Sequence, residues 1–291
     1  MIHMENIVFY DSVGNIMVER IERDYDFSMI TKHFHKEYEL YYLLEGERYY
    51  FIDRQTYHVK KGSIVFVDQN QIHKTVGASN FFHDRILVQI SDEVMKALFS
   101  VLGDMDMSAV LPGCFGVLEL NETGQQYIEQ VLFDIIEEMK KKRTGYEYIV
   151  KAKVTELLVF IMRCKKGEYT TFQVETVKTE KHKKVHEIAE YVNLNYKNKL
   201  SLDDISKHFY VSKSYLSRIY KEVTGFTVNE YINIVRIKKA KLLLETTEKP
   251  ITEVAELVGY ESITYFEKVF KVYMETSPLK YRKNNKISKR L

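Results

Sequence analysis

Four side chains in the first third of the chain have the types and spacing of a site for a metal ion or a small polar ligand. His33 and His35 are separated by one residue, so both imidazoles lie on the same face of an extended strand. Glu39 follows within the same stretch, and His73 comes from a later one. Imidazole and carboxylate groups are ligands that divalent metals accept. The same side chains could instead hydrogen-bond to one another or line a ligand pocket, so the pattern alone leaves three roles open.

The segment that holds these residues has the pattern of many short strands. Between Phe27 and Val88, runs of β-branched and aromatic residues alternate with turn sequences such as Glu45-Gly46-Glu47. This alternation predicts a sandwich or a barrel. Tyr41 lies in one of these runs and could stack on a ligand ring, although tyrosines in strands also serve packing. The predicted strands are 39–44, 49–52, 56–59, 63–67 and 85–90.

A second group of candidate residues lies in the last third of the chain, which repeats itself at an offset of about fifty residues. In each copy a short apolar segment is followed by a turn and then by a serine, Ser212 or Ser262, placed to cap a second helix. This is the pattern of a helix-turn-helix unit, whose second helix enters the DNA major groove. The outward residues of the second helices are Lys213, Ser214, Ser217, Arg218 and Lys221 in one copy, and Ile263, Thr264, Glu267, Lys268 and Lys271 in the other.

Apolar residues at helical spacing predict the elements that position these candidate DNA contacts. In the first copy, Leu216, Ile219 and Tyr220 form a stripe on one side of the second helix, so the remaining side chains point outward. A long helix between the copies would hold the two units at a fixed separation. The predicted helices of this region are 182–196, 203–209, 213–224, 227–245, 252–258 and 263–274.

The charge of the chain is divided unevenly. Its net charge is only +2, but residues 181–291 carry 22 Lys and Arg against 13 Asp and Glu, a net charge of +9, whereas residues 1–180 carry −7. A concentration of cations neutralises phosphates and releases counterions when a protein binds DNA. The basic part is the part that contains the repeat.

Two further helices are predicted between the strand-rich and the repeated regions, in 123–142 and 149–161. They could cover one side of the barrel or form a dimer interface. Residues 166–180 are polar and Thr-rich, which is typical of a linker. We therefore predict an α+β protein, with a β-barrel and a helical pair in 1–165 and an all-α domain with two helix-turn-helix units in 181–291.

Cysteine usage and hydropathy place further bounds on the chain. Cys114 and Cys164 have neither the spacing of a metal site nor that of a disulfide framework, so we expect reduced thiols. The first residues lack a basic region followed by an apolar run, and no stretch approaches the length of a membrane span. We therefore expect a cytoplasmic protein without a membrane partner.

Residues 202–282 resemble the DNA-binding region of the AraC/XylS family of bacterial transcription regulators. The matching residues are Ser212, Tyr215, Leu216, Ser217, Arg218, Lys221, Arg236, Ala240, Leu243, Leu244, Ile251, Val254, Ala255, Gly259, Tyr260, Tyr265, Phe266, Phe270, Lys271, Ser277, Pro278, Tyr281 and Arg282. The resemblance implies a regulator that binds double-stranded DNA and a small-molecule effector. It also implies a homodimer, joined through the helical pair in many relatives, and contact with RNA polymerase if the protein is an activator.

The same resemblance assigns roles to the outward residues by position. Base edges would face Ser214, Ser217 and Arg218 in the first half-site and Ile263, Thr264, Glu267 and Lys268 in the second, and phosphates would face Lys213, Lys221 and Lys271. Arg218 is the best candidate for guanine, because a guanidinium bonds both major-groove acceptors at once. Glu267 departs from the basic or neutral residue expected there, and it could select cytosine or point away.

The first region resembles the cupin fold, whose metal-binding members use two histidines, a carboxylate and a third histidine. Asp68 and Asn70 stand where the second cupin motif has Pro and Gly, which argues against a working metal centre. The resemblance implies an effector-binding domain without metal, cofactor or catalytic residues, and a sugar is a frequent effector among relatives. The implied effector-binding residues are His33, His35, Glu39, Tyr41 and His73. The alternatives are a cupin-type metalloenzyme with a helical tail and a DNA-binding dimer that needs no effector.

Overall fold

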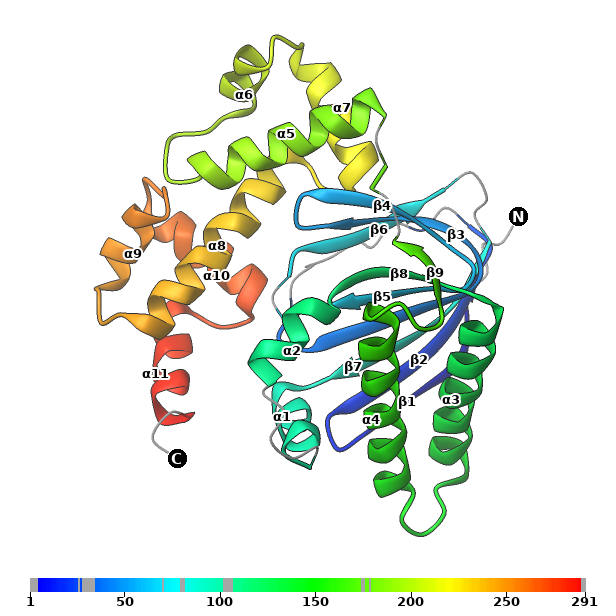
Figure 1. The fold of residues 1–291 in the computed structure, drawn as a ribbon. Coiled ribbons are helices and arrows are strands. Elements are labelled where there is room, and N and C mark those ends of the chain that lie inside the picture. Colours follow the sequence, from blue (N-terminus) through cyan, green and yellow to red (C-terminus); the bar gives the residue numbers. More distant parts are fainter. Residues whose placement is uncertain are drawn as a thin grey trace. The chain divides into compact units, whose positions relative to one another are not determined.

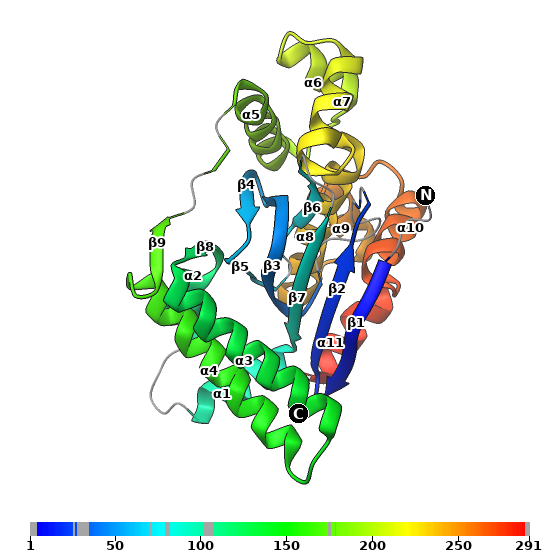
Figure 2. The same ribbon diagram turned by 90° about the vertical axis from the view of Figure 1, so that its right-hand side faces the viewer.

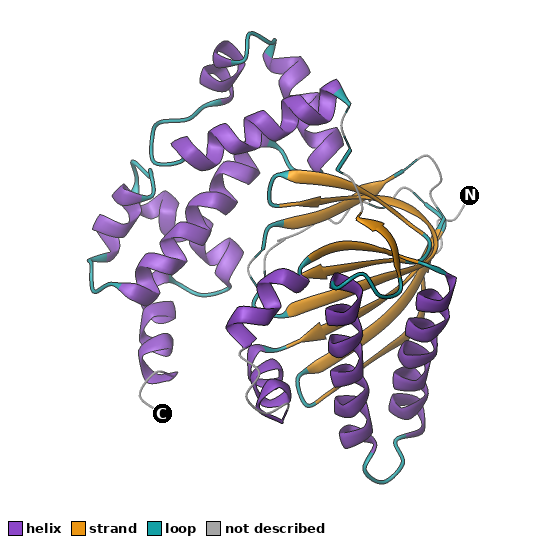
Figure 3. Cartoon of the chain, viewed as in Figure 1, coloured by secondary structure: helices purple, strands orange, loops and turns teal. Residues whose placement is uncertain are grey.

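The computed structural model describes residues 5–25, 27, 35–69, 71–78, 82–101, 107–173, 176–177 and 179–288. The chain divides into two compact units, Met1–Val177 and Lys178–Leu291, of which the first combines strands and helices and the second is helical (Figure 3). The strands are β1 (Glu5–Val13), β2 (Ile16–Arg23), β3 (Tyr38–Ile52), β4 (Gln55–Lys60), β5 (Ser63–Val67), β6 (His73–Gly77), β7 (His83–Ile90), β8 (Gly116–Leu120) and β9 (Thr170–Gln173). The helices of the first unit are α1 (Asp92–Val101), α2 (Met107–Cys114), α3 (Glu122–Lys141) and α4 (Tyr146–Lys165).

Strand β3 organises the antiparallel sheet, because its 15 residues take part in two layers. Its first half, through Gly46, pairs with β7 and in part with β5, and its second half, from Glu47, pairs with β4 and β6. The bend between the halves lies at Gly46, whose φ is 89° and where a Cβ would lie 2.2 Å from the carbonyl oxygen of Phe82. Only glycine tolerates both conditions. The sheet, in the order β1-β2-β7-β3-β5-β8-β9, therefore curls around an interior (Figure 1).

Side chains alternate between the two faces of this curled sheet. Leu40 and Tyr42 of β3 belong to a large apolar cluster that also holds Val131 of α3 and Leu157 of α4. Tyr41 belongs to a smaller cluster formed by strand residues on the opposite, interior face. Helices α3 and α4 pack side by side across the outer face (Figure 2). The two helices predicted from 123–142 and 149–161 thus cover the sheet, and the predicted α+β class is confirmed.

Part of the segment predicted as a linker, 166–180, contributes to the first unit. Strand β9 pairs with the edge strand β8, and Thr176 forms an isolated bridge with Tyr57. The polar, Thr-rich composition of this segment suits an edge strand as well as a linker, because edge strands need only one buried face.

The second unit is built around one long helix. Its helices are α5 (Glu180–Asn195), α6 (Leu202–His208), α7 (Lys213–Thr224), α8 (Val228–Thr246), α9 (Ile251–Leu257), α10 (Ile263–Met274) and α11 (Pro278–Ser288). Helix α8 contacts α5, α7, α9, α10 and α11. Figure 1 shows the α6–α7 pair toward one end of α8 and the α9–α10 pair toward the other. Among the described residues of the whole chain, no helix is both long and apolar enough to cross a bilayer.

Candidate nucleic-acid interface and ligand cavity

Helix α7 is positioned by its caps and by its apolar stripe. The hydroxyl of Ser212 accepts a hydrogen bond from the backbone N–H of Tyr215 at 3.2 Å, which satisfies one of the free amides at the helix start. Gly225 ends the helix in the left-handed conformation, with φ of 75°. Leu216 and Tyr220 are fully buried. The stripe therefore fixes which side of α7 faces the core and leaves the predicted outward residues on the other side.

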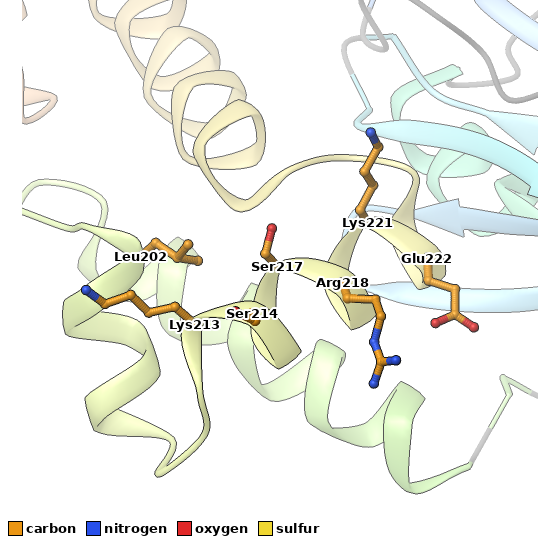
Figure 4. A pocket seen from close by; sticks show the side chains of 7 residues that line it. All are labelled: Leu202, Lys213, Ser214, Ser217, Arg218, Lys221 and Glu222. Carbon is orange, nitrogen blue, oxygen red and sulfur yellow. The ribbon is translucent and has the colours of Figure 1, made fainter.

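The five outward residues predicted for the first copy share one surface. Lys213, Ser214, Arg218 and Lys221 are exposed, and Ser217 is half-buried. Together with Leu202 and Glu222 they line a shallow surface pocket of about 620 Å³ (Figure 4). In Figure 4, Ser217 and Lys221 point to one side of this surface, and Arg218 and Glu222 point to the other. The helix thus presents hydroxyl groups between cations, which suits base edges flanked by phosphates.

The cations of this surface differ in their partners. Lys213 Nζ lies 2.7 Å from Asp203 Oδ1, and Lys207 Nζ lies 2.8 Å from Asp203 Oδ2. Hydrogen bonds from Lys207 and Lys213 lower the pKa of the Asp203 carboxyl to about 2. Within the described part of the chain, Arg218 and Lys221 form no ion pair with a carboxylate. Their charge is therefore available to an external anion, whereas Lys213 already shares Asp203.

Helix α10 repeats this arrangement with different outward chemistry. Ser262 accepts from the N–H of Tyr265 at 3.3 Å, and Phe266 and Phe270 are fully buried. The five predicted residues of the second copy are all exposed: Ile263, Thr264, Glu267, Lys268 and Lys271. By the offset of the repeat, Glu267 occupies the position of Ser217. The carboxylate therefore points outward and forms no ion pair among the described residues.

One buried arginine joins the long helix α8 to the loop after α5 and to the turn of the second copy, a role that the sequence pattern did not reveal. Arg236 of α8 donates from Nε to the carbonyl of Tyr196 and from Nη2 to that of Asn198, both at 2.9 Å. Its guanidinium lies 5.3 Å from the ring centroid of Tyr260, in the turn before α10. Gly259 in the same turn has φ of 91°, and a Cβ there would lie 2.6 Å from the Tyr196 carbonyl oxygen. The turn of the second copy therefore packs directly against the loop after α5.

In the first unit, the predicted polar cluster surrounds a buried carboxylate. Glu39 Oε2 lies 3.0 Å from His35 Nε2 and 3.7 Å from His73 Nε2, and it also accepts from Gln89 at 3.3 Å. The hydroxyl of Tyr50 donates to Glu39 Oε1 at 2.9 Å. The structure therefore brings together three of the predicted residues.

The fourth predicted ligand, His33, lies outside the described residues. Ligand atoms of His35, Glu39 and His73 all lie within 4.8 Å of one another, a spacing in which a divalent cation could be held. Burial alone would raise the pKa of Glu39, but His73 and His35 outweigh it and hold this pKa well below 4.5. Burial likewise lowers the pKa of His35, and the Glu39 carboxylate reverses the effect, so that this pKa is raised.

A small cavity lies beside this cluster, inside the curl of the sheet. Its volume is about 70 Å³. It is lined by Arg23, Phe27, Glu39, Tyr41, Tyr50, Thr75, His83, Arg85 and Leu87. Of the predicted effector-binding residues that the structure describes, Glu39 and Tyr41 line it, whereas His35 and His73 contact Glu39.

The cationic lining of the cavity was missed at the sequence level. Arg85 and Leu87 share the interior face of β7, while Ile86 and Val88 face the helices. The signal in the sequence was the charged residue Arg85, which lies on the same face of the strand as the inward-facing Leu87. It could be recognised only once the direction of Leu87 was known, because either face of a strand can be the buried one.

Comparisons with known proteins agree with both units. Residues 15–158 match the family model described as an AraC-like ligand binding domain, and residues 205–284 match the model described as a helix-turn-helix domain. The chain belongs to the AraC family of transcription regulators. As an AraC-family protein it is a DNA-binding transcriptional regulator that responds to a small-molecule effector.

Similar proteins include bacterial regulators and a solved structure. An uncharacterized HTH-type transcriptional regulator of Bacillus subtilis, YdeC, is 26% identical over 88% of this chain and 87% of its own length. The Msm operon regulatory protein of Streptococcus mutans is 35% identical over 34% of this chain and 36% of its own length. The crystal structure of ToxT from Vibrio cholerae has a TM-score of 0.37 and 17% identity, covering 92% of this chain and 97% of ToxT.

Proposed function

We propose that α7 and α10 are the recognition helices of this AraC-family regulator and that they enter successive major grooves, about 34 Å apart along one face of the duplex. The observation that carries the proposal is the outward surface of α7, where the cations Arg218 and Lys221 flank hydroxyl groups and pair with no carboxylate among the described residues. Its cap and buried stripe recur in α10.

Within this proposal the outward residues divide into two classes. Ser214, Ser217 and Arg218 contact base edges in the first half-site, and Ile263, Thr264, Glu267 and Lys268 do so in the second. Lys213, Lys221 and Lys271 contact phosphates. The pairing of Lys213 with Asp203 supports an accessory role for that lysine, because it must share or leave its partner to bind a phosphate.

Substitution of Arg218 and Lys221 separates these classes. Arg218→Ala should relax the preference for guanine at one position of the site, because a bidentate arginine–guanine pair discriminates by about 1–3 kcal/mol. Lys221→Ala should weaken binding to all sequences alike and reduce the slope of log affinity against log salt by about one. Sites are first selected from random duplexes with the wild-type protein, and each variant is then titrated against the selected site and its single-base variants.

The outcome that contradicts this assignment is specific. An Arg218→Ala variant that keeps both its affinity and its base preference would place the contact face elsewhere on α7. A Lys221→Ala variant that loses affinity only for the selected site would assign base recognition to Lys221 instead of phosphate contact.

The remaining partners follow from the family and from the composition of each unit. We infer that the effector binds in the cavity of the first unit, next to Glu39 and Tyr41. We further infer that the protein works in the cytoplasm as a homodimer joined through α3 and α4, and that it contacts RNA polymerase if it activates transcription. Tyr148 and Ile149 of α4 are 75% and 47% exposed, which supports an uncovered apolar contact surface there. Light scattering of the wild-type protein and of Tyr148→Glu tests the dimer.

One observation favours a second candidate function, a cupin-type metalloenzyme. The donor atoms of His35, Glu39 and His73 are close enough to hold a divalent cation. We propose instead that the protein is not an enzyme and that Glu39 is a structural carboxylate, since both of its oxygens accept hydrogen bonds from neighbouring side chains. Stoichiometric zinc or manganese retained after gel filtration, and lost in His73→Gln, would favour the enzyme.

A further inference from the structure

Cationic side chains converge on the interior cavity of the first unit. Arg85 of β7 and Arg23 of β2 both line it, together with His83. The guanidinium of Arg23 lies 3.8 Å from the ring centroid of Phe27, and that of Arg85 lies 6.0 Å from the ring centroid of Tyr41. The two arginines thus extend along aromatic walls of the cavity.

One guanidinium nitrogen of Arg85 is buried without an acceptor. Arg85 Nη2 donates to the carboxylate of Glu19 on β2, but Nη1 has less than 1 Å² exposed and no hydrogen-bond partner within the described residues. Burying a charged donor without an acceptor is unfavourable, because the group loses its hydrogen bonds to water. Arg85 itself lines the cavity, so a ligand there that carries an acceptor can pair with this guanidinium.

A third arginine, Arg48, strengthens the positive potential of this region. It is fully buried, and its Nη2 donates to the carbonyl of Phe27, a residue of the cavity lining. Burial raises the pKa of Tyr41, and the charges of Arg48, Arg85 and Arg23 all act in the opposite direction. Positive potential from three arginines therefore reaches the Tyr41 side chain that lines the cavity.

The carboxylate in the cavity wall is already engaged by other donors. Glu39 accepts hydrogen bonds from His35, Tyr50 and Gln89, so its acceptor capacity is directed at neighbouring side chains. The carboxylate of Glu19 satisfies Nη2 of Arg85 and leaves Nη1 without an acceptor among the described residues. A cavity of about 70 Å³ is several times the volume that one water needs, about 10–15 Å³, and accommodates a group of a few heavy atoms.

We propose that this cavity binds an oxyanion, so that the effector of the regulator carries a carboxylate or a phosphate that Arg85 and Arg23 hold. This inference rests on the proposed function in placing the effector in this unit. It departs from the sugar expected by family resemblance, because a neutral sugar brings no charge to match the positive potential around Arg85. Arginine is well suited to the task, since its planar fork binds both oxygens of a carboxylate or phosphate.

Thermal unfolding of the full-length protein with simple probes tests the proposal. Inorganic phosphate and acetate represent the two sources of an oxyanion, and sodium chloride at equal ionic strength and glycerol are the references. We expect phosphate, acetate or both to raise the unfolding midpoint in a saturable way. The anion that raises the unfolding midpoint more identifies the chemical class of the effector's oxyanion. No stabilisation by either anion beyond the chloride reference overturns the proposal.

The sheet supplies a matched pair of variants. Arg85 pairs with Glu19 and Arg20 pairs with Asp84, so both arginines form ion pairs between β2 and β7, but only Arg85 of these two lines the cavity. Arg85→Gln should weaken anion binding by about tenfold or more, whereas Arg20→Gln should leave it unchanged. Equal losses in both variants would contradict the proposal. If Arg85→Gln fails to fold, Arg23→Gln replaces it with the same expectation.

Two further measurements separate the failure of this proposal from the failure of the proposed function. Arg218→Ala should retain the anion effect, which excludes binding of the anion to the basic surface of α7. Arg85→Gln should still bind the selected DNA site when no anion is present. If it does so while the wild-type protein shows no anion effect, the oxyanion proposal is wrong and the DNA-binding assignment stands.

Discussion

Buried charges in the two units are stabilised by different kinds of partner. Arg236 in the second unit donates to two backbone carbonyls, which do not titrate, so this contact is the same at every physiological pH. Glu39 in the first unit depends on His35, whose imidazole can gain or lose a proton. The stability of the first unit should therefore depend on pH through the His35–Glu39 pair.

The pKa shifts of this pair define the pH range of that dependence. The pKa of His35 is raised above 6.5 in the folded state, so its contribution is fully present below pH 6.5 and is lost as the pH rises through the folded pKa. The pKa of Glu39 lies well below 4.5, so its contribution is present above pH 4.5 and is lost as the pH falls through the folded pKa. We expect the free energy of unfolding of the first unit to fall as the pH rises above 6.5, measured by urea unfolding.

Two variants check the origin of this effect. His35→Gln removes the titrating group, and Glu39→Gln removes the carboxylate that raises its pKa, so both should flatten the decline above pH 6.5. A decline that persists at wild-type size in His35→Gln would assign the pH dependence to another group.

The outward residues of α7 could be predicted at this scale because the spacing of Leu216, Ile219 and Tyr220 indicates the core side of the helix. Arg85 could not, because its direction depends on pairing with β2, and no local pattern specifies which strands become neighbours. The grouping of His35, Glu39 and His73 was predictable from their residue types. The cavity beside Tyr41 could be located only in the folded sheet.

Among the elements, the repeated helices agree closely with their sequence pattern, and the differences lie in the turns. Helix α6 ends at His208 and α9 at Leu257, so the second copy has one more residue before its capping serine. Strands β6, β8 and β9 and helices α1, α2 and α11 were not predicted. The short β6 is paired through the bent second half of β3, a contact that no local pattern specifies.

The turn of the second copy yields a prediction about Gly259. Its φ is 91°, and a Cβ at this position would lie 2.6 Å from the carbonyl oxygen of Tyr196 and 2.8 Å from that of Lys197, which excludes any side chain. Gly259→Ala should destabilise the second unit by about 1–3 kcal/mol from backbone strain, with a further cost from the two carbonyl contacts. Chemical unfolding and titration with the selected DNA site measure the loss.

A matched glycine isolates the contribution of the contacts. Gly167 has φ of 93°, but a Cβ there has nothing within 4 Å. Gly167→Ala should therefore show the backbone cost alone and leave DNA binding unchanged. Equal effects of the two substitutions on unfolding would mean that the Tyr196 loop moves aside without cost.

For the molecule as a whole, the division of charge matches the division into units. The net charge of +9 in residues 181–291 lies in the DNA-binding unit, and the acidic remainder carries the interior cavity. This division could be predicted from composition, since counting charges needs no knowledge of strand pairing. The boundary between the two units was harder to predict, because the residues of β9 belong to the first unit but have the composition of a linker.

Regulation requires that the two units be coupled energetically, and that coupling must be reciprocal. If an oxyanion in the cavity changes the affinity for DNA by some factor, DNA must change the affinity for the anion by the same factor. We expect calorimetric titration with the effective anion to give different dissociation constants with and without the selected DNA site. The ratio should equal the change in DNA affinity that the anion produces.

The variants of the two sites make this test specific to the proposed mechanism. Arg85→Gln should bind DNA with the affinity of the anion-free wild-type protein, and should not respond to the anion at concentrations that saturate the wild-type protein. Arg218→Ala should bind the anion normally. Its weaker DNA binding should still change by the wild-type factor when the anion is added, because the proposed contact of Arg218 with DNA is the same in both states. If the anion changed the DNA affinity of Arg218→Ala by a different factor, Arg218 would take part in the coupling itself. If the anion bound equally well with and without DNA, its binding could not regulate DNA binding.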